Sequence, residues 1–176
     1  MSKLFAATMV FALALIAGAM PGTCLAQAAN DSDDLAGAWR GAMQFTSGGF
    51  AGTKDLELMY AFAAGGTMTE SSNYDAVPPV PPAYGVWKRV GVRKYEAKYQ
   101  FFQTRAVSSA DQLVKDGGWV PNGYGVISQT FTLSADGKTF DSRATLELFD
   151  QQGKPMAGGG EATAKGARIG FQIAGT

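Results

Sequence analysis

Apolar and polar residues alternate with a period of two along most of this sequence, and this pattern constrains the fold more than any other feature. Leu56, Leu58, Tyr60 and Phe62 alternate with two carboxylates, a methionine and an alanine, and residues 94–103 repeat the pattern. Successive side chains of a strand point to opposite faces, so the alternation is typical of strands with one buried face. The chain is therefore predicted to be built almost entirely of strands.

Turn signals divide the alternating segments into separate strands. Residues 64–66, 135–138 and 150–154 are rich in the glycine and aspartate that tight hairpins favour. The predicted strands are 37–47, 54–63, 66–73, 84–90, 92–106, 123–134, 138–149 and 159–174. Consecutive antiparallel strands joined by short hairpins predict an all-β fold, an eight-stranded antiparallel up-and-down β-barrel, in preference to a sandwich.

Two segments interrupt the alternation. Residues 77–82 contain four prolines, which lack a backbone donor, so this segment should form an extended connection at the rim of the barrel. Ser108 or Ser109 is expected to cap a short helix over 110–115 that ends at Gly117. This helix would be either a lid over a cavity or a plain surface excursion.

The N-terminus has the pattern of a secretory signal peptide. Lys3 precedes an apolar run over 4–20, and Ala26-Gln27-Ala28 is a small-residue cleavage pattern. We predict cleavage after Ala28, so that residues 1–28 are the signal peptide and residues 29–176 form a single β-barrel domain. The expected location is periplasmic or secreted, without a stable membrane span after processing.

Two other interpretations of the N-terminus are less consistent with its residues. A membrane anchor would need an apolar span of roughly 20 residues, and the run over 4–20 is short for that. A lipoprotein would be attached through Cys24, but Pro21 and Thr23 do not suit the sequence that such processing prefers. Because Cys24 is the one cysteine of the chain, the mature domain is expected to have no disulfide and to depend on its core.

The composition excludes several classes of function. The chain has no histidine, which removes Ser-His-Asp and Cys-His nucleophiles and the usual imidazole sites for zinc or iron, so neither a metal nor a cofactor is expected. Its 15 basic and 15 acidic residues give a formal charge of zero, which argues against a nucleic-acid partner. The oligomeric state does not follow from the sequence.

The first predicted strand opens with a Gly-x-Trp motif, Gly37-Ala38-Trp39, within residues 35–41. A second Gly-x-Trp, Gly85-Val86-Trp87, and an Ala-Asp-Gly-Lys hairpin at 135–138 follow. With these residues the chain resembles lipocalin-like (calycin) proteins, and in particular small bacterial lipocalin-like and allene-oxide-cyclase-like barrel proteins. The resemblance covers the mature chain as an architecture.

The resemblance implies structural roles at the start and end of the barrel. In such proteins the tryptophan of the first strand closes the barrel floor, and a basic residue near the last strand packs across its indole. The matching positions are Gly37 with Trp39, and Arg168, with Lys165 as the alternative basic residue. A guanidinium over an indole makes a cation–π contact of about 0.5–2 kcal/mol.

The residues expected to face the barrel interior are mostly aromatic, with a few polar groups. An eight-stranded barrel encloses enough space for side chains or for one small ligand, so a small hydrophobic or amphipathic molecule is the predicted partner. The predicted ligand-binding residues are Tyr60, Trp87, Tyr95, Tyr99, Phe101, Gln103 and Gln129. Tyr99, Gln103 and Gln129 are the strongest candidates, because a buried polar group needs a hydrogen-bond partner. The same residues would otherwise fill the interior as an ordinary core.

An enzyme is the alternative function. If Met68 faces inward, alternation places Glu70 and Ser72 inside as well. A carboxylate in an apolar barrel has a raised pKa and can act as a general acid or base, assisted by Tyr60 or Tyr99 as a phenol donor. A cofactor-independent cyclase or isomerase needs little more than this. Glu70 would instead be solvated if it lay at the rim, and a ligand-binding protein is preferred over an enzyme.

Overall fold

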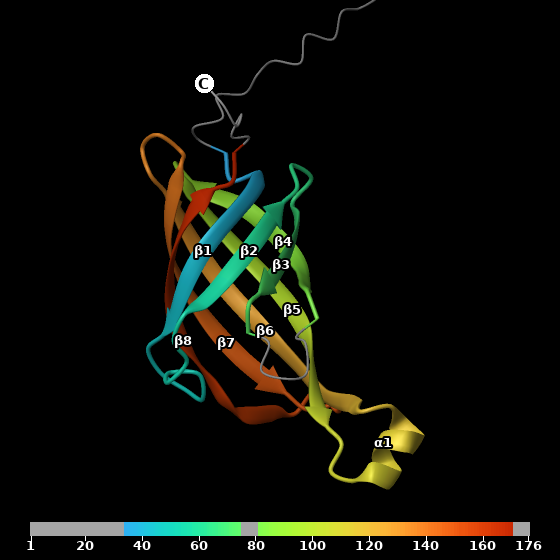
Figure 1. Ribbon diagram of the computed structural model, residues 1–176. Coiled ribbons are helices and arrows are strands. Elements are labelled where there is room, and N and C mark those ends of the chain that lie inside the picture. The colour runs from blue at the N-terminus through green and yellow to red at the C-terminus, as the bar shows by residue number, and fades with distance from the viewer. Residues whose placement is uncertain (1–33, 75–80, 171–176) are drawn as a thin grey trace, which may run out of the picture.

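The protein forms a closed eight-stranded antiparallel barrel in the computed structural model, which describes residues 34–74 and 81–170 (Figure 1). Each strand pairs with its neighbours in sequence, and β8 closes the barrel against β1. The elements are β1 (Gly37–Phe45), β2 (Leu56–Phe62), β3 (Thr67–Ser72), β4 (Ala83–Gly91), β5 (Lys94–Ala106), α1 (Ala110–Asp116), β6 (Trp119–Leu133), β7 (Thr139–Phe149) and β8 (Pro155–Arg168). The predicted all-β up-and-down barrel is confirmed.

Two strands begin four residues earlier than predicted. β6 begins at Trp119 instead of residue 123, because residues 119–121 pair with the end of β5 beyond a register shift between Gln103 and Thr104. β8 begins at Pro155 instead of residue 159, because Pro155 and Met156 pair with Phe149 and Leu148 of β7 on the far side of a second register shift. The predicted signal peptide, residues 75–80 of the proline-rich connection and the last residues of the predicted eighth strand lie outside the described residues.

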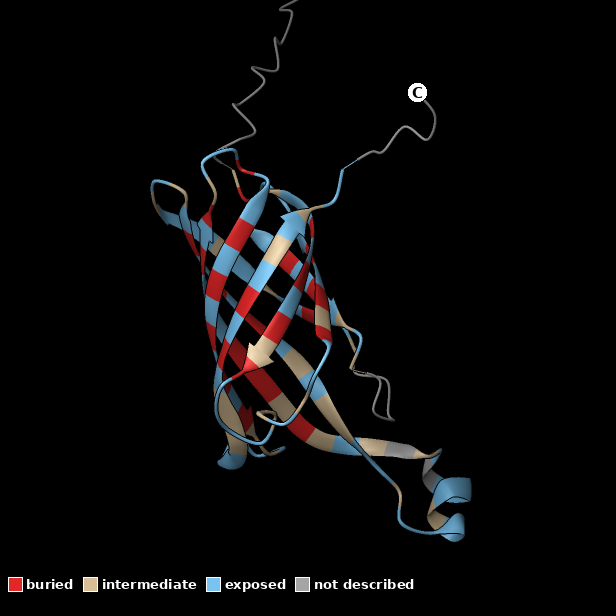
Figure 2. Cartoon of the chain, turned by 60° about the vertical axis from the view of Figure 1, so that its left-hand side comes forward, coloured by how far each residue is buried: buried red, intermediate tan, exposed pale blue. Residues whose placement is uncertain are grey.

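Alternation along the strands produces the core. Buried and exposed residues follow each other in bands on β1, β2, β3 and β7 (Figure 2). The inward-facing side chains form one hydrophobic cluster, in which Trp39, Tyr60, Tyr95, Tyr99, Phe131 and Phe140 are among the largest fully buried members. Burial of aromatic rings at this scale is the main stabilising contribution in a domain of this kind.

The end of the barrel at which β1 begins and β8 ends is closed by Trp39 and Arg168; we call it the closed end. The guanidinium carbon of Arg168 lies 4.3 Å from the centroid of the Trp39 ring, which confirms the predicted cation–π pair. Arg168 also donates to the backbone oxygens of Asp34 (2.5 Å) and Ala36 (2.6 Å). The Trp39 indole N–H donates to the backbone oxygen of Leu35 at 2.9 Å, so this end is both packed and hydrogen-bonded.

Gly37 makes room for this arrangement. Its φ is +128°, and a Cβ at this position would lie 2.7 Å from a guanidinium nitrogen of Arg168, so a side chain there would be strained and would obstruct the arginine. Lys165, the alternative basic residue, lies on the outside of the barrel and pairs with Asp141 at 3.2 Å. Alternation explains the difference, because Arg168 and Lys165 are three residues apart and occupy opposite faces of the strand.

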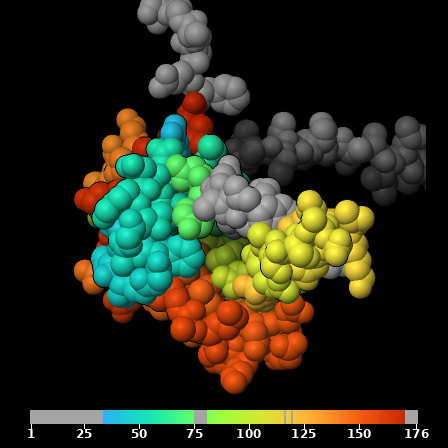
Figure 3. Space-filling view, turned by 60° about the horizontal axis from the view of Figure 1, so that its bottom comes forward, coloured from blue at the N-terminus to red at the C-terminus, as the bar shows by residue number. Residues whose placement is uncertain are grey.

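The β5–β6 connection forms an arm that carries α1 beyond the other end of the barrel, which we call the open end (Figures 1 and 3). Ser109 caps the helix by accepting from the backbone N–H of Gln112, and Gly117 ends it in the left-handed conformation, as the sequence predicted. The arm extends away from the barrel, so α1 is a surface excursion and not a lid. Within the described residues, no helix has the length and apolar character needed to cross a membrane.

Candidate functional site

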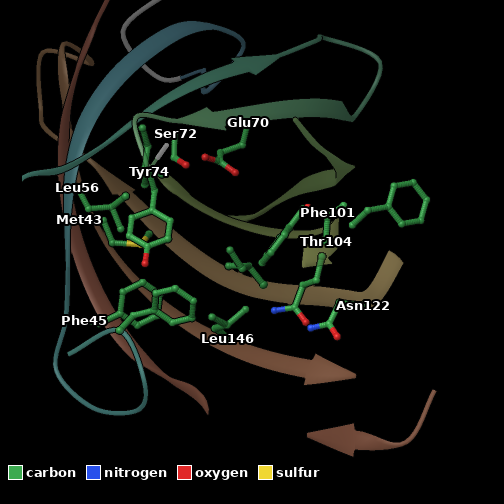
Figure 4. A pocket seen from close by; sticks show the side chains of 15 residues that line it. Met43, Phe45, Leu56, Glu70, Ser72, Tyr74, Phe101, Thr104, Asn122 and Leu146 are labelled. Atoms are coloured by element: carbon green, nitrogen blue, oxygen red, sulfur yellow. The ribbon is translucent and has the colours of Figure 1, made fainter. Parts of the chain in front are cut away.

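The barrel interior is packed near the closed end and hollow near the open end. In the packed part, the rings of Tyr60, Phe62, Phe131 and Phe140 contact one another with centroid distances of 5.2–6.0 Å. Toward the open end the inward side chains leave a cavity of about 200 Å³ (Figure 4). The arm with α1 and the β7–β8 hairpin flank a recess when this end is viewed directly (Figure 3).

The cavity wall is mostly apolar and comes from several strands. Its apolar members include Met43, Phe45, Leu56, Leu58, Ile127 and Leu146. Its polar members are Glu70, Ser72, Tyr74, Gln103, Thr104 and Asn122. A concave apolar wall with a few polar groups is the usual character of a small-molecule site.

Glu70 lies inside the barrel because it follows the alternation of β3. It pairs with Tyr60 of β2 on one side and Ala83 of β4 on the other, and it is only 7% exposed. Its Oε1 atom has no hydrogen-bond partner within the described residues. Burial therefore raises the pKa of Glu70 from its usual 4.5 to about 7. The interpretation in which Glu70 is solvated at the rim is wrong.

Gln103 contributes a second polar group without a partner. It is the last inward residue of β5 before the register shift opposite Gly123, whose φ of +116° accommodates the irregular backbone. The side-chain oxygen of Gln103 is buried and has no hydrogen-bond partner within the described residues. Glu70 and Gln103 are thus buried acceptors on the wall of the same cavity.

Tyr60, Tyr99 and Gln129 form a hydrogen-bonded layer beneath the cavity. The Tyr99 hydroxyl donates to Oε1 of Gln129 at 2.5 Å, and Nε2 of Gln129 donates to the Ser142 hydroxyl at 2.7 Å. The Tyr60 hydroxyl lies 3.4 Å from the same Gln129 oxygen. Tyr99 and Gln129 were predicted to bind a ligand because buried polar groups need hydrogen-bond partners. They find those partners in each other and in Ser142, within the protein itself.

The layer forms the floor of the cavity. On β2, Tyr60 is the next inward residue after Leu58 of the cavity wall, in the direction of the closed end. Tyr99 follows Phe101 of the wall in the same way on β5, and Gln129 follows Ile127 of the wall on β6. Burial raises the pKa of both tyrosines, so their phenols stay protonated at neutral pH.

Trp87 and Tyr95 belong to the packed part. The Trp87 ring lies 5.9 Å from that of Phe62 and 5.7 Å from that of Tyr95, and its indole N–H donates to the backbone oxygen of Ala63 at 2.9 Å. Of the residues predicted for ligand binding or catalysis, the structure brings Phe101, Gln103 and Glu70 to the cavity wall. The other predicted residues lie in its floor or in the packed part; they are Tyr60, Trp87, Tyr95, Tyr99 and Gln129.

Sequence analysis missed several residues of the cavity wall. The ring centroid of Phe45, at the end of β1, lies 5.4 Å from that of Phe50 in the following loop. The Phe50 centroid lies 5.7 Å from that of Tyr74, which follows β3. The alternation of β1 was a usable signal for Phe45. Phe50 and Tyr74 lie outside the alternating segments, where only their position next to the open end distinguishes them.

No protein-family model matches this chain, and no curated protein matches it in sequence. Within the described residues, no group of three or more His, Cys, Asp or Glu side chains is arranged to hold a metal ion. The structure is consistent with the lipocalin-like resemblance at the level of a closed eight-stranded antiparallel barrel.

Proposed function

We propose that this protein binds one small, mostly apolar molecule in the cavity at the open end of the barrel. The observation that carries the proposal is the cavity itself, because the same barrel is tightly packed with aromatic rings nearer its closed end. Protein interiors are normally close-packed, and a void that interrupts the packing leaves its lining without contacts. A ligand would restore those contacts.

The volume limits the size of the molecule. A dry protein cavity of roughly 150 Å³ holds benzene, whereas drug-sized ligands occupy pockets of roughly 300–1,000 Å³. At about 200 Å³, the cavity suits a molecule with a single ring or a short chain. The alternating strands provide the apolar wall, and the polar groups on it would orient the bound molecule.

We also propose that the protein belongs with the lipocalin-like barrels and acts after export. The closed barrel and the pair of Trp39 and Arg168 support the first part. The sequence pattern of residues 1–28 supports the second. Cell fractionation with N-terminal sequencing would test export: the protein should be recovered outside the cytoplasm with Ala29 as its first residue, and recovery only inside the cytoplasm would contradict it.

Native mass spectrometry with a cavity-filling variant tests the binding function. Leu146→Phe adds volume at the cavity wall, whereas Val86→Phe adds the same kind of ring at a position that is 60% exposed on the outside. The wild type and Val86→Phe should retain a small co-purifying or added apolar ligand, and Leu146→Phe should lose it. Equal retention by the folded Leu146→Phe protein would contradict the proposed site.

Catalysis by a cyclase or isomerase is the second candidate, and Glu70 is the observation that favours it. Its carboxyl borders the cavity, and its pKa of about 7 suits a group that must both accept and release a proton near neutral pH. Proton exchange between a bound ligand and D₂O would test this function. The wild type should incorporate deuterium faster than Glu70→Gln, and equal rates would exclude Glu70 as the base.

A further inference from the structure

We propose that the molecule bound in this cavity is an amine, with an apolar body of single-ring size and a cationic nitrogen that pairs with Glu70. This inference depends on the proposed binding function and adds the chemical class of the ligand. It is carried by the charge and the hydrogen-bonding groups of the cavity wall.

The charge of the wall favours a cation. Glu70 is the one charged side chain among the described residues that line the cavity, and no lysine or arginine accompanies it. A carboxylate or phosphate ligand would meet Glu70 without any compensating cation. An ammonium group would form an ion pair within a mostly apolar wall, where such a pair is stronger than at the surface.

The unpartnered acceptors favour a ligand with several donors. Glu70 and Gln103 each have a buried oxygen without a hydrogen-bond partner in the described part of the chain. A buried acceptor without a partner is destabilising, and only a donor can correct it. An ammonium has three donors and no acceptor, whereas a hydroxyl has a single donor.

The aromatic side chains of the wall are compatible with the same ligand. Phe45, Phe50, Tyr74 and Phe101 all border the cavity (Figure 4). Aromatic faces attract cations and also pack well against an apolar ring or chain. The wall can therefore hold both ends of a small apolar amine.

The side chains that neighbour Glu70 on the adjacent strands are neutral, so the ligand would supply its cationic partner. Glu70 pairs with Tyr60 of β2 and with Ala83 of β4, and its charge helps to raise the pKa of the Tyr60 and Tyr99 phenols. Both phenols remain neutral in the range where Glu70 titrates. An ammonium bound beside Glu70 would shift this carboxyl to its ionised form, so binding should release a proton below pH 7.

A matched series of four probes tests the inference: 2-phenylethylamine, 2-phenylethanol, phenylacetate and ethylbenzene. They share a ring and a short chain and differ in the group at the end. Isothermal titration at pH 8 should show the amine binding about ten- to a hundredfold more tightly than the alcohol and ethylbenzene. Phenylacetate should bind most weakly. The amine should lose about tenfold in affinity between pH 8 and pH 6, and the alcohol should not.

The variant Glu70→Gln removes the charge and keeps the shape of the side chain. It should bind the amine no better than the alcohol while retaining the affinity for ethylbenzene. The amine inference is wrong if the alcohol or phenylacetate binds the wild type as tightly as the amine does. It is also wrong if Glu70→Gln keeps the preference for the amine over the alcohol. In both cases the proposed binding function stands. If none of the four probes binds, the proposed binding function fails with it.

Discussion

The Tyr99 hydroxyl donates a 2.5 Å hydrogen bond to the side-chain oxygen of Gln129, and this pair lies in the floor that separates the packed part of the barrel from the cavity. Gln129 also donates to Ser142, so the two polar side chains are satisfied within the protein. Gln103, by contrast, lines the cavity, and its buried side-chain oxygen has no hydrogen-bond partner within the described residues. The structure therefore assigns different roles to polar residues that the sequence grouped together.

Tyr99→Phe should lower stability without affecting the ligand site. It removes the shortest hydrogen bond to the Gln129 oxygen, so the free energy of unfolding should fall by about 1–3 kcal/mol in urea titrations. Gln103→Leu should have the opposite profile, with unchanged or higher stability and altered ligand affinity. A Tyr99→Phe protein that is fully stable but no longer binds ligand would show that Tyr99 contacts the ligand directly.

Glu70 should make stability depend on pH. Its pKa is about 7 in the folded protein and close to 4.5 in the unfolded chain, so the folded state holds the proton more tightly. The resulting stabilisation is complete below pH 4.5 and is lost as the pH rises to 7, by about 3 kcal/mol in total.

Comparison with Glu70→Gln isolates this effect, because the variant keeps every other titratable group. Urea titrations between pH 4 and pH 8 should show the wild type losing stability relative to Glu70→Gln up to about pH 7, and little change above it. A difference between the two proteins that stays constant with pH would mean that the Glu70 carboxyl is solvated in solution.

Arg168→Lys should destabilise the closed end. Lysine cannot reproduce the planar contact with Trp39 or the paired donation to the backbone oxygens of Asp34 and Ala36, so a loss of about 2 kcal/mol is expected. Lys165→Ala is the matched control, since its ion pair with Asp141 is exposed and should contribute under about 1 kcal/mol. Thermal unfolding of both variants measures the difference, and equal effects would contradict the role of Arg168.

Gly125→Ala should narrow the cavity from one side. A Cβ at Gly125 would lie 2.3 Å from the Phe101 ring, so that ring must move, and Phe101 borders the cavity. Ligand affinity should fall severalfold, with only a modest loss of stability because a side chain can move more readily than the backbone. Gly65→Ala is the control, since nothing lies within 4 Å of a Cβ there. Unchanged affinity in Gly125→Ala would place the ligand away from Phe101.

The sequence by itself determined the barrel and its closed end. Alternation in segments such as 56–62 and the turns between them were sufficient for an eight-stranded meander, because a period of two specifies which side chains face inward. Local chemistry also predicted a helix cap at Ser108 or Ser109, which the structure places at Ser109, and the lipocalin-like resemblance implied the contact of Arg168 with Trp39. Both depend on short-range patterns or on the ends of adjacent strands.

Only the tertiary structure decided where the barrel is hollow and which polar groups remain without partners. Alternation gives the face of a side chain but not its depth along the barrel axis, which depends on the stagger between neighbouring strands. That stagger brings the side chains of Tyr99 and Gln129 into one hydrogen-bonded layer. It leaves Glu70 and Gln103 on the cavity wall. The loop residue Phe50 reaches this wall through its ring contacts, which no periodicity specifies.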